Sequence, residues 1–174
     1  MKIVLIRHTS VDVARGICYG FSDVPLSPSF EQEAEEVKKK LEVFGKFDRV
    51  FSSPLMRATR LAEYCGFLDY KTDDRLREMN MGDWEMKRYE EIVDPNLQVW
   101  YEDHINTPTT NGESFKDLIA RVGNFFDDIK SFNDNQIAVF THSGVITASK
   151  ILLGKSDISA ALNDMPKYGD VIEM

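Results

Sequence analysis

The chain has 174 residues, of which 43% are hydrophobic and 29% are charged, and its formal net charge is −8. Length and composition are those of a globular protein, and we expect one domain over residues 1–174. The negative charge argues against binding of nucleic acid, which needs a basic surface. The apolar run at the start has five residues. It is too short for a signal peptide or a membrane span, so we expect a cytoplasmic protein with no membrane partner.

The first part of the chain alternates short apolar runs with amphipathic stretches. Residues 2–6 form a β-branched run typical of a buried strand, and residues 9–27 indicate a long loop. Ser27 followed by Pro28 predicts a helix start, because serine caps helices and proline suits the first turn. Apolar residues at helical spacing continue that helix until Gly45.

The same pair of signals occurs a second time. Residues 49–52 predict a second strand, and Ser53 followed by Pro54 predicts a helix that runs to about Tyr64. Residues 74–112 are rich in Met, Asp, Glu and Trp and have weak periodicity. We therefore expect short helices and loops over the edge of the sheet there.

The last part of the chain carries the strongest helix signal. Thr110 with Glu113 three residues later predicts a capping box, and apolar residues from Phe115 to Ile129 predict a long amphipathic helix. The remaining predicted elements are a strand over residues 136–141, a helix over about 144–153 and an edge strand over 170–174. Strands that alternate with helices predict an α/β fold, here a three-layer sandwich whose central, mostly parallel sheet is flanked by helices.

Two of the three histidines directly follow predicted strands, His8 after the first strand and His142 after the last long one. Parallel strands present functional residues at their carboxyl ends, so we expect the two rings to meet. Neutral imidazole serves as a nucleophile or an acid–base group near neutral pH. Two other interpretations stay open, strand-capping histidines and metal ligands. His104, Cys18 and Cys65 show no metal-ligand spacing, and we expect both cysteines to be free thiols.

Charged side chains complete a predicted anion site. Arg7 precedes His8, and Arg57 lies early in the helix after the second strand. A guanidinium forks onto phosphate or carboxylate, and the free amides at a helix start also favour an anion. Taken alone, each arginine is more commonly explained as a surface or packing residue. Glu78 is the best acid–base candidate, although Asp83 and Glu85 match it by composition.

Four motifs, in this order along the chain, resemble the histidine phosphatase superfamily, which includes the cofactor-dependent phosphoglycerate mutases. The motifs are Arg7-His8-Thr9, Ser52-Ser53-Pro54-Leu55-Met56-Arg57-Ala58, Leu76-Arg77-Glu78 with Gly82-Asp83-Trp84-Glu85, and Thr141-His142-Ser143-Gly144. Within the superfamily, residues 82–86, residues 111–113 and the short length most resemble α-ribazole phosphatases. Those enzymes remove phosphate from α-ribazole 5'-phosphate in assembly of the cobalamin lower ligand.

The resemblance implies a role for each matching side chain. His8 attacks phosphorus and becomes a phosphohistidine, and Arg7, Arg57 and His142 form a positive pocket around the phosphoryl oxygens. Glu78 protonates the leaving alkoxide and then helps to activate water. No metal and no cofactor is expected, because the two arginines and the histidine already neutralise the phosphate. The expected partner is a small phosphomonoester.

The first loop departs from the family pattern. The glycine and glutamate that usually follow Arg-His are replaced by Thr9 and Ser10, which puts the substrate contacts of this loop in doubt. The loop before the first helix still resembles that of the family. We expect Ser10, Tyr19 and Gly20, with Trp84 from the middle segment, to form the pocket wall.

Three functional hypotheses follow. The leading one is a metal-independent phosphomonoesterase that acts through a phosphohistidine, with α-ribazole 5'-phosphate as its substrate. Phosphoglycerate mutase, or a phosphatase for another small phosphomonoester, is the alternative within the family, although the short chain leaves little room for a water-excluding lid. An inactive, anion-binding regulatory domain is the alternative from another class. The sequence leaves the oligomeric state open.

Overall fold

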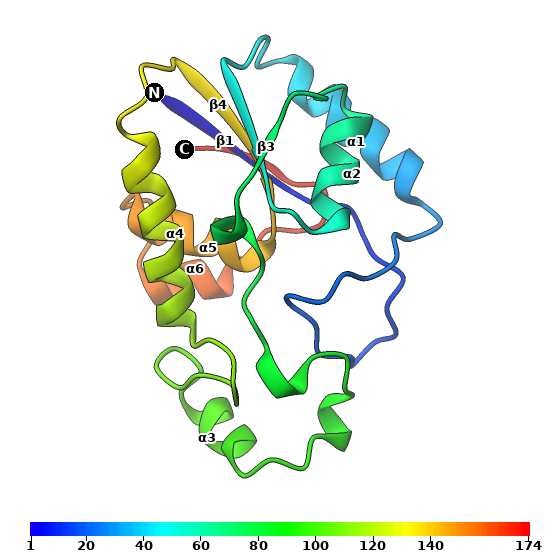
Figure 1. Cartoon of the computed structure of the whole chain (residues 1–174), viewed down its shortest axis with the longest axis vertical. Helices are drawn as coiled ribbons and strands as arrows, with labels where there is room; N and C mark the ends of the chain where they lie inside the picture. Colours follow the sequence, from blue (N-terminus) through cyan, green and yellow to red (C-terminus); the bar gives the residue numbers. More distant parts are fainter.

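The computed structural model describes all 174 residues and contains one five-stranded sheet (Figure 1). The strands are β1 (Lys2–Arg7), β2 (Arg49–Ser52), β3 (Lys71–Thr72), β4 (Gln136–Thr141) and β5 (Val171–Glu173). Their order across the sheet is β3-β2-β4-β1-β5. All neighbouring pairs are parallel except β1 and β5, which are antiparallel. The predicted edge strand at the C-terminus is therefore confirmed, whereas β3 lacked any sequence signal.

Helices cover both faces of this sheet, which confirms the predicted three-layer α/β fold (Figure 1). The helices are α1 (Phe30–Glu42), α2 (Met56–Tyr64), α3 (Asn96–Glu102), α4 (Phe115–Ile129), α5 (Ser143–Leu152) and α6 (Ile158–Asn163). Three single turns of 3₁₀ helix, η1 (Asp74–Leu76), η2 (Gly82–Trp84) and η3 (Tyr89–Glu91), lie between β3 and α3. None of these helices has the length and the apolar character that crossing a membrane requires.

Alternate residues of the central strands serve opposite faces, as the two-residue period of a strand requires. Ile3 and Leu5 of β1 pack into the core with α4 and α5. Val4 and Ile6 pack into the core with α1 and α2. Both faces of β1 are thus buried, which explains why its sequence is a continuous apolar run rather than an alternating one.

The pairing of β1 with β4 brings the two histidines together. Arg7 lies opposite Thr141 in the parallel register, so the chain leaves both strands at the same edge of the sheet. The backbone amide of His8 donates to the Thr141 carbonyl at 3.1 Å, one step beyond the last strand pair. His8 and His142 therefore emerge side by side.

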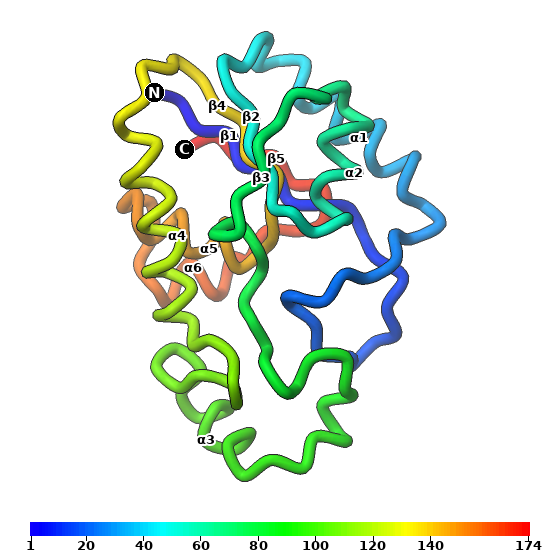
Figure 2. Tube along the Cα trace, viewed as in Figure 1, coloured from blue at the N-terminus to red at the C-terminus, as the bar shows by residue number.

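Two long connections form the part of the molecule beyond this edge of the sheet (Figure 2). The loop after β1 meets the segment after η2 through backbone bonds, Cys18 to Lys87 at 2.9 Å and Met86 to Cys18 at 2.7 Å. Cys18, Met81 and Trp84 form a small core of their own beneath these bonds. The weakly periodic middle segment is thus folded, as short helices and loops, against the first loop.

Both helices begin about one half-turn after the predicted serine-proline starts. Helix α1 begins at Phe30, and the Ser27 hydroxyl before it accepts from the Ser29 amide at 3.3 Å and bonds the Ser29 hydroxyl at 2.7 Å. The same helix ends at Glu42, ahead of the expected Gly45. Helix α2 begins at Met56, whose free amide donates to the Asp23 carboxylate at 2.7 Å. The Ser53 hydroxyl accepts from the Leu55 amide at 3.3 Å, so a loop carboxylate and the expected serine both bond amides at the start of this helix.

The capping box of the long helix also lies later than predicted. Ser114 and Asp117 form it, bonding each other's backbone amides at the start of α4. The expected partner Glu113 instead accepts from the Asn80 amide at 2.8 Å and from the guanidinium of Arg121 at 2.7 Å. The helix itself, over Phe115–Ile129, agrees with the predicted range.

Arg121 of α4 ties the segment that carries Glu78 to the body of the fold. Its guanidinium donates to the carbonyls of Arg75, Arg77 and Glu78 at 2.8, 3.0 and 3.2 Å. It also forms a two-point ion pair with Glu113, and both side chains are largely buried. One side chain therefore satisfies three carbonyls within four residues of a segment that has little regular structure of its own.

Replacing Arg121 by Met should lower the free energy of unfolding by about 2–4 kcal/mol, because it leaves Glu113 and three carbonyls without their donor. Lys116→Met is the matched control, since it removes the same charge from an exposed position of α4. Chemical denaturation of both variants measures the difference. Equal effects of the two substitutions would show that the buried network contributes nothing.

Candidate active site

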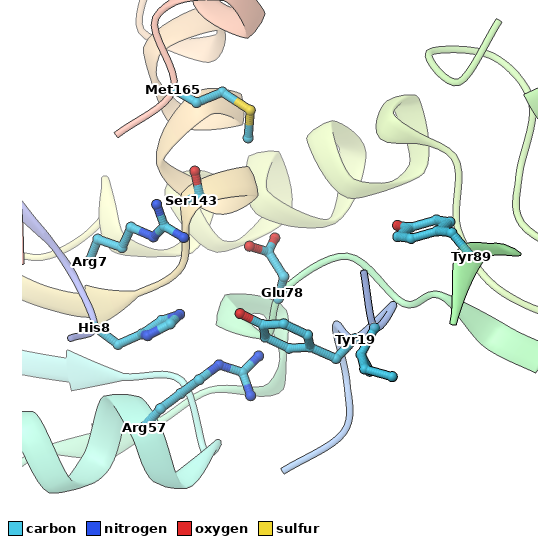
Figure 3. A pocket seen from close by; sticks show the side chains of 9 residues that line it. Arg7, His8, Tyr19, Arg57, Glu78, Tyr89, Ser143 and Met165 are labelled. Carbon is cyan, nitrogen blue, oxygen red and sulfur yellow. The ribbon is translucent and has the colours of Figure 1, made fainter. Parts of the chain in front are cut away.

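A cavity of about 370 Å³ lies at the carboxyl edge of the sheet, where β1 and β4 end (Figure 3). Four of the predicted catalytic and phosphate-binding residues line it, namely Arg7, His8, Arg57 and Glu78. Its other lining residues are Ile17, Tyr19, Tyr89, Ser143 and Met165. The cations and the carboxylate come from three different elements of the chain, and the fold alone brings them together.

His8 has one ring nitrogen committed to the backbone. Its Nδ1 lies 2.6 Å from the Thr9 carbonyl oxygen, which only accepts, so Nδ1 carries the proton in the neutral ring. The lone pair is therefore on Nε2. Burial and, next, the positive charge of Arg57 hold the pKa of His8 well below 6.5. The ring is a neutral nitrogen base inside a cationic cavity.

His142 lies behind His8, with 5.1 Å between the ring centroids. Its Nδ1 accepts from Arg57 Nε at 3.2 Å, so the proton is on Nε2, which lies 2.7 Å from the Ser53 hydroxyl. Burial and then Arg57 lower the pKa of His142 well below 6.5. His142 is completely buried and does not itself line the cavity. The ring nitrogens of His142 thus contact Arg57 and Ser53, and its expected contact with the phosphate stays a prediction.

The guanidinium of Arg57 is completely buried without a carboxylate bonded to it. It donates to the carbonyls of Gly20 at 2.6 Å and Ser22 at 2.9 Å, besides His142. Burial lowers the pKa of Arg57, and Glu78 opposes that effect. Neutral acceptors leave its positive charge uncancelled, which suits an anion in the cavity.

Arg7 has N–H donors that form no hydrogen bond within the protein. One terminal nitrogen donates to the Pro166 carbonyl at 2.5 Å, and the ring of Tyr168 stacks 4.0 Å from the guanidinium carbon. Its Nε is buried and has no partner in the protein. A buried N–H without a partner is costly, so this atom marks a place where a ligand acceptor belongs.

The carboxylate of Glu78 is held by two backbone amides. The Met79 amide donates to Oε1 at 2.9 Å, and the Gly144 amide at the start of α5 donates to Oε2 at 3.1 Å. A Cβ at position 144 would collide with Oε1, so only glycine permits this approach. The two bonds fix where Glu78 exchanges a proton.

The other two acidic candidates, Glu85 and Asp83, accept hydrogen bonds away from the cavity. Glu85 accepts from the amides of Gly20 at 3.0 Å and Phe21 at 2.7 Å. Burial alone would raise the pKa of Glu85, but the Ser22 hydroxyl and these amides bring it below its ordinary value. Asp83 accepts from Asn111 at the surface. Glu78 is the acidic residue that lines the cavity.

One of the four expected wall residues forms part of the cavity surface. Tyr19 lines it, and its hydroxyl lies 3.0 Å from that of Tyr168. Gly20 contributes its carbonyl to Arg57 rather than a surface to the cavity. Its Cα is so close to Met79 that a side chain there would collide with the backbone.

The remaining two expected wall residues, Ser10 and Trp84, do not line the cavity. Ser10 donates its amide to Glu33 of α1 at 2.8 Å, which turns it away from the cavity. Trp84 is buried in the small core beneath the long connections, and its indole N–H donates to Asp94 at 2.7 Å. An indole of this size is more stable inside that core than beside the charged cavity.

Sequence reasoning missed residues that act on the site from outside the predicted elements. Ser53 resembled a helix cap, yet its hydroxyl holds His142. Tyr168 and Met165 had no signal, because only the antiparallel return of β5 brings the preceding segment back over Arg7. Nowhere do three or more His, Cys, Asp or Glu side chains gather as they do around a metal ion.

Comparison with known proteins agrees with this arrangement. The family model described as "Histidine phosphatase superfamily (branch 1)" matches residues 3–163. The adenosylcobalamin/alpha-ribazole phosphatase of Salmonella typhimurium is 31% identical over 156 residues, which cover 84% of this chain and 76% of that protein. Phosphoglycerate mutase-like protein 4 of Arabidopsis thaliana is 32% identical over 83% of this chain and 67% of its own length.

A solved structure agrees as well. The alpha-ribazole phosphatase from Shigella flexneri superposes with a TM-score of 0.89 over 99% of this chain and 89% of that chain, at 24% identity, which shows a common fold. The match over residues 3–163 confirms the resemblance inferred from the four motifs. The chain therefore belongs to the histidine phosphatase superfamily, branch 1, and is a phosphoric monoester hydrolase.

Proposed function

We propose that the protein hydrolyses a small phosphomonoester through a phosphohistidine on Nε2 of His8. The observation that carries this proposal is the cavity itself, in which the free Nε2 of a neutral His8 faces two uncancelled guanidinium groups and a held carboxyl group. Two chemical steps follow from it, transfer of the phosphoryl group to nitrogen and its transfer to water.

In the first step the lone pair of His8 Nε2 attacks phosphorus, and the ester P–O bond breaks. The protonated carboxyl group of Glu78 gives its proton to the leaving oxygen, which departs as an alcohol. In the second step a water oxygen attacks phosphorus while Glu78 takes back a proton. The P–N bond then breaks, and phosphate and neutral His8 are restored.

Charge stabilisation comes from the arginines. The transferred phosphoryl group carries its charge on the equatorial oxygens, and fixed donors around it lower the barrier in a buried site. Arg7 offers the unpartnered Nε, and Arg57 is held in position by His142 and two carbonyls. In this proposal His142 acts with Arg57 as a positioning partner, and no step requires a metal.

The substrate we propose is α-ribazole 5'-phosphate. The name of the Salmonella relative and the likeness of residues 82–86 to the α-ribazole phosphatases support it. Another small phosphomonoester stays as the alternative. We further propose a cytoplasmic location, which the two free cysteines support.

Replacing His8 by Ala should lower turnover of p-nitrophenyl phosphate by about a thousand-fold or more, since the nucleophile is lost. The wild-type protein should work unchanged in EDTA, and rapid acid-free quenching should reveal a protein heavier by one PO₃ group. The same adduct should be missing from His8→Ala. Turnover that needs added metal, or that survives the substitution, would refute the mechanism.

Arg57→Ala should lower the same activity by about a hundred- to a thousand-fold, because one fixed cation is lost and His142 loses its partner. Arg60→Ala is the matched control, since Arg60 lies one turn further along α2 and is exposed. Steady-state kinetics of both variants, with thermal unfolding as a check on folding, measure the effect. Equal activities of the two variants would remove Arg57 from the proposed site.

Lowering the pH should destabilise the protein before its carboxylates begin to protonate. Both buried histidines have pKa values lowered by burial and Arg57, so the unfolded chain binds more protons than the folded one below pH 6.5. The free energy of unfolding should therefore fall as pH falls from about 6.5 towards 5, by up to about 1.4 kcal/mol per pH unit for each histidine. Denaturation across this range measures the slope of the free energy of unfolding against pH. The substitution His142→Gln should reduce this slope by the contribution of one histidine. An unchanged or opposite slope would contradict the assignment of two neutral histidines.

A further inference from the structure

A second compartment of about 250 Å³ adjoins the cationic cavity. The two share Tyr19, Glu78, Tyr89 and Met165, so they are continuous around the Glu78 carboxylate. The rest of the second compartment is lined by Met79, Met81, Trp100, His104, Phe115, Leu118, Gly144 and Leu162. Its walls therefore come from the middle segment, from α4 and from α6, and only at Glu78 do they include a catalytic residue.

The chemistry of this compartment is opposite to that of the cavity beside it. Nine of its twelve lining residues are hydrophobic, and no lysine or arginine is among them. A carboxylate or a second phosphate placed there would lose its hydration, would find no lysine or arginine and would face Glu78. An uncharged ring or alkyl group would gain from burial against thioether and aromatic surfaces.

The geometry of the reaction leads the substrate into this compartment. Phosphorus must lie at His8 and the ester oxygen at Glu78, so the carbon beyond that oxygen extends past Glu78, away from the arginines. In Figure 3, Glu78 and Tyr19 lie between the cationic side chains and Tyr89, on the side shared with the apolar compartment. The hydroxyl group of Tyr19 lies 3.0 Å from the hydroxyl group of Tyr168.

We infer that the compartment binds the alcohol portion of the substrate, and that this portion is uncharged and apolar or aromatic. Trp100 of α3 and Leu162 of α6 are specificity-determining residues in this assignment, because they line the compartment and do not line the cationic cavity. The inference rests on the proposed phosphatase function and adds to it the class of the leaving group. It disfavours phosphomonoesters that carry a second negative charge, 3-phosphoglycerate among them.

Three alkyl phosphates with leaving groups of similar basicity test this. They are 2-phenylethyl phosphate, ethyl phosphate and 2-carboxyethyl phosphate. Burial of the phenyl group should raise kcat/KM by about 10- to 100-fold over ethyl phosphate. The carboxylate should lower it by about 10-fold, because it is desolvated beside Glu78.

Leu162→Arg introduces a cation into the compartment and should reverse this order. It should lower kcat/KM for 2-phenylethyl phosphate by about 10-fold or more. It should change kcat/KM for ethyl phosphate by less than about twofold and should raise kcat/KM for 2-carboxyethyl phosphate. Asn163→Arg is the matched control, since it adds the same charge at the next, exposed position of α6. Trp100→Ala, a substitution in a different helix, should lower the ratio of kcat/KM for 2-phenylethyl phosphate to kcat/KM for ethyl phosphate. It should leave kcat/KM for ethyl phosphate unchanged.

The outcomes separate the two proposals. Equal kcat/KM for the three esters, or an equal loss for all three in Leu162→Arg, would overturn the assignment of the compartment and leave the phosphatase standing. Turnover of p-nitrophenyl phosphate without turnover of 2-phenylethyl phosphate would overturn it as well. Loss of all turnover in the wild type, p-nitrophenyl phosphate included, would instead refute the proposed function.

Discussion

The buried guanidinium of Arg57 is the constraint on which the rest of the site depends. A positive charge removed from water is costly unless its donors find acceptors, and here three of the five N–H groups donate to two carbonyls and one imidazole nitrogen. The carbonyls of Gly20 and Ser22 must therefore lie against α2, which explains why so many bonds hold that loop. Because the acceptors are neutral, the charge of Arg57 remains available to an anion.

The same contact determines the state of both histidines. Arg57 Nε donates to His142 Nδ1, so His142 carries its proton on the other nitrogen and turns it to Ser53. The charge of Arg57 also keeps His8 and His142 neutral, together with their burial. A single buried cation thus both attracts the phosphate and keeps the proposed nucleophile unprotonated.

Chemistry and substrate choice are built by different parts of the molecule. The cationic cavity lies at the ends of β1 and β4, where parallel pairing leaves little freedom of position. The apolar compartment comes instead mainly from the long connections, from α6 and from the first turn of α4. Loops and peripheral helices tolerate change better than a central sheet does, so this division lets specificity vary while the reacting groups stay in place.

Much of this arrangement was predictable from the sequence, because strong local signals carry it. The apolar runs before His8 and His142 predicted buried parallel strands, and parallel strands that end together bring those histidines to one edge. The long amphipathic helix over 115–129 was equally clear. The order of four motifs then indicated the family, which the family model confirms over residues 3–163.

Only the tertiary structure decided what each polar side chain contacts. Ser53 has a cap-like sequence but bonds His142, Trp84 lies in a core rather than a pocket wall, and Glu78 differs from Glu85 through its neighbours alone. By itself the sequence determined four of the five strands, the main helices and the two strand-end histidines, since periodicity and burial are local properties. Hydrogen-bond partners and cavity walls come from residues far apart in the chain, so no local pattern specifies them.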